Sequence, residues 1–446
     1  MILKSKFIKT FIAIILIIAL ALGLMMGWQP GGHEFSAEKM AELTGENFET
    51  IFPIGRYREI YVADAEKGLF VVKNGAKQQG DEGEFSIVDA EDNFLCALPY
   101  SHVQEHVGSS FAMVEDGAWY YVNAEISAET GTPPKQGHDR VELSAKGGYA
   151  LLKDGDQYVV ADSEGKDVYT PQDRGTGSKA PYFMGPEGYI IERDPDDRQY
   201  IVNVRTGETE YEVPEKIRAS AYKGGLWFMD CAGETDGLNF SYFYALDEDF
   251  NLTADGGIFT AYNISSDSSD KYVSVQQEYD VDYSTRDVLA DMSLFNVKGS
   301  MKRVYNGEGQ LVYGGDEEEE TYHGGFIRYI RGNMLAVSDY TEKKVDYIDL
   351  DTGEVVIEDS EIFCYMDFGD GAAAAVMPRR TEDRDVRGGD LLSDEKEMKK
   401  YKWGLVDENL QPLTEFVFDG VYPGNNGYAV VIKDGQKGLI RLKGVR

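Results

Sequence analysis

The sequence predicts an all-β repeat protein, most simply a seven- or eight-bladed β-propeller that follows an N-terminal transmembrane helix. Three observations predict it: a recurring corner in which apolar residues run into Asp or Asn, Asp-Gly turns between apolar strands, and one uncharged apolar segment near the N-terminus. The chain has 446 residues, with 49 Gly and 29 Tyr but only 13 Pro. That composition suits many short strands joined by tight turns.

The corners set the predicted architecture. Eight residues occupy the corner position: Asp89, Asn123, Asp162, Asn203, Asp247, Asn306, Asp349 and Asp407. Most successive corners lie about 40 residues apart, which is the length of one propeller blade. Eight corners therefore predict seven or eight blades. A closed ring removes exposed sheet edges, but periodicity does not show closure, so an open β-solenoid of the same repeats is the alternative.

The N-terminal segment is predicted to cross a membrane. Three lysines precede an uncharged apolar stretch from Thr10 to Trp28, which is long enough to span a bilayer as a helix. Because lysines remain on the cytoplasmic side, we expect residues 1–9 in the cytoplasm and residues 10–28 as a signal anchor. The rest of a single-pass cell-membrane protein would then lie outside.

Cleavage of this segment is the alternative. Ala19-Leu20-Ala21 supplies the small residues that a signal peptidase prefers. Cleavage there would release a secreted protein. The apolar run continues past that point through Met26, which favours the uncleaved anchor.

Residues 29–55 are predicted to form a stalk with one short helix, and residues 56–446 a β-repeat ectodomain. Ser36 can cap the start of that helix, and Gly45 can end it. After residue 56 the pattern is strand and turn, with no long run of helical periodicity.

Hairpins recur along the ectodomain. Asp-Gly or Asn-Gly joins two apolar strands at Asn74-Gly75, Asp116-Gly117, Asp154-Gly155 and Asp434-Gly435. Both residues of such a turn tolerate positive φ, which makes the dipeptide a strong hairpin signal.

At these residues the chain resembles the tryptophan-glycine (WG) β-repeat proteins of bacteria. The strand Trp403-Gly404-Leu405-Val406-Asp407 and residues 402–442 around it match that repeat well, and residues 94–170 match it moderately. The resemblance implies a β-repeat fold at the bacterial surface or in a secreted protein. It implies no common activity.

Composition excludes one class of partner and leaves the cysteines unpaired. The net charge is −35 and the pI about 4.5, so the surface should repel nucleic acid, which is bound through clustered Lys and Arg. Cys96, Cys231 and Cys364 lie far apart and show no metal-site spacing. We expect them to be small buried apolar side chains.

One motif carries the spacing of a zinc hydrolase. His102, Glu105 and His106 form H-x-x-E-H, which binds zinc when both histidines share one face of a helix. Pro99 and Gly108 leave room for barely two helical turns. We therefore assign no catalytic, cofactor or metal residue, and interpret this segment as part of the repeat. Asp367-Phe368-Gly369 matches a kinase tripeptide without the other kinase motifs.

Calcium is the expected ion if the chain binds one. Asp247, Asp249 and Asn251 alternate oxygen donors, as do Asp280 and Asp282. Neither set has the glycine and distal glutamate of a helix-loop-helix calcium loop.

Two insertions lengthen the repeat, from Asn263 to Met292 and from Arg379 to Lys400. Loops on a rigid scaffold often carry binding function. We expect a membrane-anchored, non-catalytic binding or scaffolding module whose partner is a protein or a cell-wall glycan. The alternative is an extracellular hydrolase or lyase with its site on the propeller axis or in the first insertion.

Overall fold

The computed structural model describes residues 34–444, apart from residues 75–83, 173, 176–178, 216, 236–237, 254–257, 260, 265–268, 280–298, 315–324, 340–344, 365–373, 379–400, 408 and 425. Within those limits the chain is all-β. Helix α2 (Ala37–Thr44) and helix α3 (Ala124–Thr130) are the exceptions.

The described strands form nine small antiparallel sheets. In order of pairing they are β1 (Phe48–Tyr57), β34 (Gln436–Leu442), β33 (Tyr428–Lys433) and β32 (Gly420–Pro423); β2 (Glu59–Asp64), β3 (Leu69–Lys73), β4 (Phe85–Asp89) and β5 (Phe94–Leu98); β6 (His102–Val107), β7 (Ser110–Glu115) and β8 (Ala118–Asn123); β9 (Arg140–Leu143), β10 (Tyr149–Asp154), β11 (Gln157–Asp162) and β12 (Asp167–Tyr169); β13 (Lys179–Phe183), β14 (Tyr189–Arg193), β15 (Gln199–Asn203) and β16 (Glu208–Glu212); β17 (Ile217–Lys223), β18 (Leu226–Thr235), β19 (Leu238–Leu246) and β20 (Ile258–Phe259); β21 (Ala261–Ile264), β22 (Tyr272–Tyr279), β23 (Gly299–Asn306) and β24 (Leu311–Tyr313); β25 (Gly325–Arg331), β26 (Met334–Asp339), β27 (Val345–Asp349) and β28 (Glu354–Ser360); and β29 (Ile362–Cys364), β30 (Ala374–Pro378) and β31 (Gly404–Val406).

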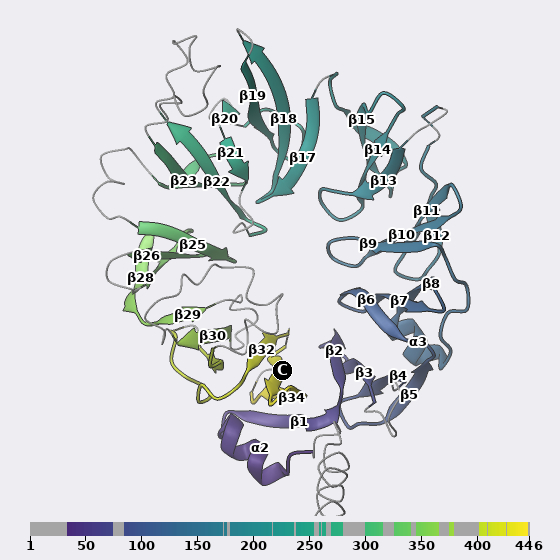
Figure 1. Cartoon of the computed structure of the whole chain (residues 1–446), viewed down its shortest axis with the longest axis vertical. Helices are drawn as coiled ribbons and strands as arrows, with labels where there is room; N and C mark the ends of the chain where they lie inside the picture. Colours follow the sequence, from purple (N-terminus) through teal and green to yellow (C-terminus); the bar gives the residue numbers. More distant parts are fainter. Residues whose placement is uncertain are drawn as a thin grey trace, which may run out of the picture.

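These sheets follow one another in chain order around a ring (Figure 1), in a propeller-like arrangement. The first strand, β1, pairs with the last strand, β34, from Phe48 opposite Leu442 to Tyr57 opposite Lys437. The sheet of β1 and β32–β34, here called the closing sheet, therefore contains both ends of the repeat region. An open solenoid would keep its first and last repeats apart, so this pairing contradicts the solenoid alternative.

The closing sheet also explains why eight corners accompany nine sheets. Each corner residue ends the third strand of its sheet, just before the chain turns toward the outer position. In the closing sheet β1 occupies that outer position beside β34. No corner is needed there, because the outer strand arrives from the other end of the chain.

The corner residues are hydrogen-bond acceptors. At Asp407 the Oδ1 atom accepts the backbone N–H groups of Asn409 (2.9 Å) and Gln411 (2.8 Å). Asp162 accepts from Glu164 (3.0 Å) and Lys166 (2.9 Å) in the same way. The side chains of the other six corner residues also accept N–H groups from two to four residues later. Asp and Asn recur here because their short side chains satisfy the donors of the turn.

This role predicts a difference between two substitutions at Asp162. Alanine removes the acceptor for two turn N–H groups and should lower the free energy of unfolding by about 1 to 2 kcal/mol. Asparagine keeps the Oδ1 acceptor, as Asn203 and Asn306 do at their own corners, and should change stability little. Denaturant titration of both variants tests this. Equal losses for alanine and asparagine would contradict it.

Two predicted hairpins have the expected turn geometry. Asp116 and Gly117 have φ of 49° and 80°, and Asp434 and Gly435 have φ of 52° and 75°. The Asp-Gly prediction is confirmed at these turns. Gly75, in the first hairpin, lies outside the described residues.

The core lies between neighbouring sheets. All five residues of β3 are buried. Phe70 and Val72 pack with Val430 of the closing sheet, whereas Val71 packs with Met113 of β7 on the other side. Middle strands are therefore apolar on both faces, because each sheet is covered twice.

Helix α2 belongs to the ring. It begins after Ser36, whose Oγ accepts the N–H of Lys39 (3.3 Å), and it is capped by Gly45, as the sequence predicts. Met40 is fully buried and packs with Ile54 of β1 and with Trp403. The predicted stalk boundary at residue 55 is therefore wrong, since residues 48–55 form most of β1.

The first insertion is also shorter than predicted. Asn263 lies in β21, and residues 272–279 form β22, so both belong to a sheet. Residues 280–298, with Asp280 and Asp282, lie outside the described residues, as does Arg379 to Lys400.

The predicted cytoplasmic tail (residues 1–9) and transmembrane segment (residues 10–28) also lie outside the described residues. From residue 34 onward, the described helices are too short or too polar to cross a membrane.

Candidate functional site

The H-x-x-E-H segment is a strand. His102, Glu105 and His106 lie in β6, with a register shift between Val103 and Glu105 where β6 pairs with β7. The helix that would bring both histidines to one metal does not form. A strand fits because β6 must pair along β7 to complete its sheet.

The side chains of this motif contact neighbouring sheets instead. The His106 ring lies 4.8 Å from the Tyr61 ring, edge to face, and 5.5 Å from the Phe111 ring, stacked. Loss of surrounding water, followed by the nearby Lys437 charge, lowers the pKa of His106. Glu105 accepts the N–H of Leu143 at 3.3 Å. The motif therefore connects β6 to its neighbours in the ring.

Asp247 and Asn251 have an evident local role. Asp247 Oδ1 accepts the N–H groups of Asp249 (3.0 Å) and Asn251 (2.8 Å), and its Oδ2 accepts from Asn251 Nδ2 (3.3 Å). Both carboxylate oxygens thus face N–H donors within their own turn. Within the part of the chain that the structure describes, no three His, Cys, Asp or Glu side chains are grouped to hold a metal.

Cys96 and Cys364 are free and buried, which confirms the prediction for these two. Cys231 lies in β18, opposite Tyr242 of β19. Asp367-Phe368-Gly369 lies outside the described residues.

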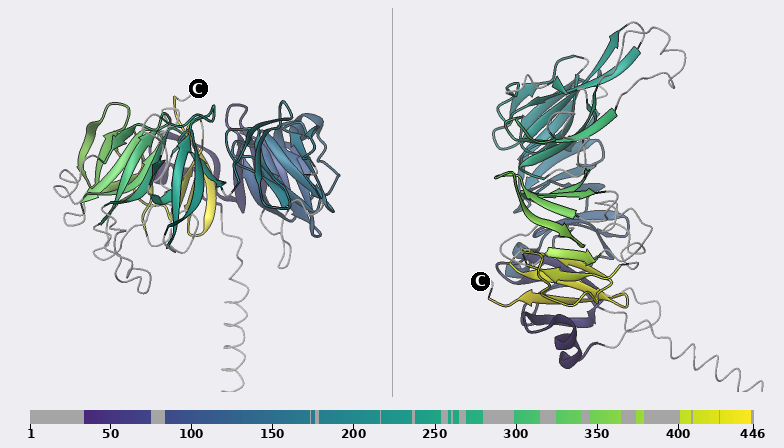
Figure 2. Two further views of the ribbon diagram at one scale, coloured as in Figure 1. Left: turned by 90° about the horizontal axis from the view of Figure 1, so that it is seen from above. Right: turned by 90° about the vertical axis from the view of Figure 1, so that its left-hand side faces the viewer.

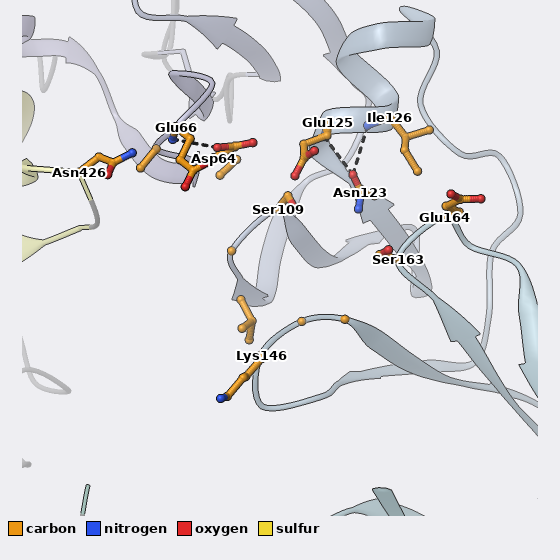
Figure 3. A pocket seen from close by; sticks show the side chains of 16 residues that line it. Asp64, Glu66, Ser109, Asn123, Glu125, Ile126, Lys146, Ser163, Glu164 and Asn426 are labelled. Carbon is orange, nitrogen blue, oxygen red and sulfur yellow. Dashed lines mark hydrogen bonds between the residues drawn. The ribbon is translucent and has the colours of Figure 1, made fainter. Parts of the chain in front are cut away.

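A polar pocket lies where turns of four sheets meet (Figure 3). Its volume is about 590 Å³. The lining side chains and glycines come from the turns after β2, β6, β9 and β32 and from the ends of β8 and β11. They include Asp64, Glu66, Ser109, Asn123, Glu125, Lys146, Ser163, Glu164 and Asn426.

The charge of the lining is unbalanced. Four carboxylates line the pocket, with one lysine, Lys146. Asp64 Oδ1 accepts the N–H groups of Glu66 (2.9 Å) and Lys67 (3.0 Å), and Glu125 is paired with the ammonium of Lys67. Glu66 and Glu164 are exposed. These two carboxylates are therefore the ones available to a ligand.

Contacts between sheets fix the pocket wall. Ser110 Oγ donates to the carbonyl of Gly147 at 2.6 Å, which joins β7 to the turn after β9. Gly147 has φ of 74°, and a Cβ there would lie 2.4 Å from the Val107 carbonyl oxygen. Only glycine permits this close approach of two turns.

The turn that carries Lys146 is held from the next sheet. Glu187, between β13 and β14, accepts the N–H of Lys146 (3.0 Å) and of Gly148 (2.8 Å). It also accepts from Ser144 Oγ at 2.5 Å. Lys146 thus projects from a rigid turn, which is a favourable basis for selective binding.

The sequence analysis missed this pocket. Its residues are separated by up to several hundred positions, from Asp64 to Asn426, and share no motif. The nearest signal was the corners, since Asn123 is a corner and Ser163 and Glu164 directly follow another.

Comparisons with known proteins identify no family. No family model matches the chain, and no curated protein matches it. Solved structures give distant likenesses. A eukaryotic initiation factor shares 11% identity at a TM-score of 0.42 and covers 82% of this chain and 88% of its own.

Two further likenesses are weaker. The computationally designed Ika8 protein has a TM-score of 0.31 at 11% identity, with 92% of this chain and 100% of its own covered. BamB from Moraxella catarrhalis has a TM-score of 0.33 at 11% identity, with 86% and 96% covered. At these values the likenesses carry no argument about function.

Proposed function

We propose that this chain is a membrane-anchored, non-catalytic binding module that holds a protein partner in the pocket of Figure 3. The observation that carries the proposal is the pocket itself, a concave polar site built from turns of four successive sheets. Sites of this kind on a rigid scaffold are typical of recognition surfaces.

The lining favours a basic group on the partner. Four carboxylates against one lysine create a negative potential that attracts a Lys or Arg side chain. No aromatic residue lines the pocket, and a neutral cell-wall glycan would gain nothing from the excess charge. A protein is therefore the better fit of the two partner classes expected from the sequence.

We further propose that the ring is a complete propeller in which β1 acts as the closing strand, and that its repeats are divergent WG-type units. The β1–β34 pairing supports the first part. The buried Trp403 beside Gly404 and the shared corner chemistry support the second. The anchoring rests on the apolar segment of residues 10–28. The hydrolase alternative stays a prediction, since residues 280–298 of its insertion lie outside the described part.

The test uses the full chain in detergent, applied to a native envelope extract, to Lys- and Arg-containing peptides and to a cell-wall glycan array. We expect a protein or basic peptide to bind. The double variant Glu66→Gln and Glu164→Gln should bind it at least tenfold more weakly, equivalent to about 1.4 kcal/mol.

The matched control is Glu208→Gln and Glu215→Gln, which removes the same charge from exposed positions outside the pocket. It should bind as the unsubstituted chain does. Equal weakening of both double variants would show only a general charge effect. Binding confined to the glycan array would refute the protein partner.

A further inference from the structure

The attachment of the N-terminal segment to the ring limits how far the ring can stand from a membrane. Phe35 is already part of the folded body: its N–H donates to the carbonyl of Ile54 at 2.8 Å, and its ring packs against the core around Met40. The Lys39 ammonium lies 3.6 Å from the centre of the same ring. Folded structure therefore begins at residue 35.

Little chain remains between this point and the predicted membrane segment. Only seven residues, from Gln29 to Phe35, follow Trp28. Even fully extended they reach about 25 Å. The predicted stalk is thus a short tether, because β1 and α2 are built into the ring.

The tether joins the ring at one end of its long axis. Helix α2 and β1 lie at the bottom of Figure 1, and β18 and β19 lie at the top. The right-hand view of Figure 2 shows the same order, with α2 at one end and the teal sheets at the other. The two ends of the molecule therefore differ in their distance from the attachment point.

We infer that the edge of the ring formed by α2 and β1 faces the bilayer, and that the pocket works in the membrane-proximal half of the molecule. This inference rests on the proposed anchoring. The pocket includes Asn426 of the closing sheet and turns of the three sheets that follow it, so it lies toward the attached end. Its protein partner is accordingly one that presents its basic group close to the membrane surface.

The tether holds this edge near the lipid, not an attraction of the edge itself. The exposed face of α2 and its flanks carry Glu34, Glu38 and Glu42 against Lys39. A negative face gains nothing from contact with anionic lipid headgroups. Lengthening the tether should therefore release the edge from the membrane.

Energy transfer from a fluorophore on the full chain to acceptor-labelled lipid headgroups tests the orientation in reconstituted vesicles. One donor is placed at Glu42→Cys in α2 and the other at Asp249→Cys in the turn after β19, both exposed positions. Labelling of the unsubstituted chain corrects for the native cysteines. We expect strong transfer from position 42 and weak transfer from position 249.

A second variant carries twenty flexible Gly-Ser residues after Gly31 and should lose most of the transfer at position 42. Equal transfer from the two positions, or unchanged transfer after the insertion, would overturn the inference while the chain stays in the vesicles. Removal of the chain by an alkaline wash would instead refute the proposed anchoring, and the inference with it.

Discussion

Replacing Glu192 by alanine is expected to lower the free energy of unfolding by about 3 kcal/mol. Glu192 is only 2% exposed. It accepts from the Tyr169 hydroxyl (2.7 Å), the Gln172 N–H (2.8 Å) and Arg174 Nε (2.7 Å). Its removal leaves a largely buried guanidinium and two further donors without their acceptor, which is the costly way to break a buried ion pair.

This group of contacts joins two neighbouring sheets. Tyr169 lies in β12 and Glu192 in β14, and the Arg174 guanidinium also lies 4.1 Å from the Tyr200 ring of β15. Burial, followed by the bond to Glu192, raises the pKa of Tyr169, so its hydroxyl remains a donor at neutral pH.

Chemical denaturation of the Glu192→Ala variant measures the loss. The matched control is Glu212→Ala, which breaks the exposed pair with Arg198 in the same sheet. Exposed pairs add little, and we expect no measurable loss there. Equal stabilities of the two variants would refute a structural role for the buried pair.

Placing a methyl group on Gly438 is expected to weaken the closing sheet by about 2 kcal/mol. A Cβ on Gly438 would lie 2.7 Å from Ile54 Cγ1 and 2.9 Å from the Ile54 nitrogen. The methyl group would meet the backbone of β1, which cannot move aside without loosening its pairing with β34. The Gly438→Ala variant should therefore open at the β1–β34 seam.

Hydrogen exchange of the β1 amides, together with denaturant unfolding, measures this effect. Exchange should accelerate in β1 more than in strands on the far side of the ring, such as β18. Gly424→Ala is the matched control in the same sheet, because its Cβ would come no closer than 3.4 Å to other atoms. If the two variants exchange alike in β1, the seam does not depend on this close contact.

Local chemistry explains the features that the sequence predicted well. An Asp or Asn at the end of a third strand accepts N–H groups within four residues, as at Asp89. Ser36 caps α2 three residues away from its donor. Asp116 and Gly117 turn a hairpin by their own backbone preferences. Each of these depends on neighbours in the chain, so the sequence pattern reveals it.

The predictions that failed required knowledge of distant partners. Residues 48–55 show nothing that distinguishes a stalk from a strand until β34 pairs with them. The count of seven or eight blades followed from the corners, and the closing sheet has none. The H-x-x-E-H spacing fits a helix equally well, and pairing with β7 decides for a strand.

The sequence by itself determined the repeat, its corners and its hairpins, because these arise from contacts a few residues apart. Only the tertiary structure decided the joining of the chain ends through β1, the burial of Glu192 with Arg174, and the pocket between Asp64 and Asn426. In each case the interacting groups are separated along the chain by a sheet boundary or by nearly its whole length. Their proximity follows from how the sheets pack around the ring, which no local pattern records.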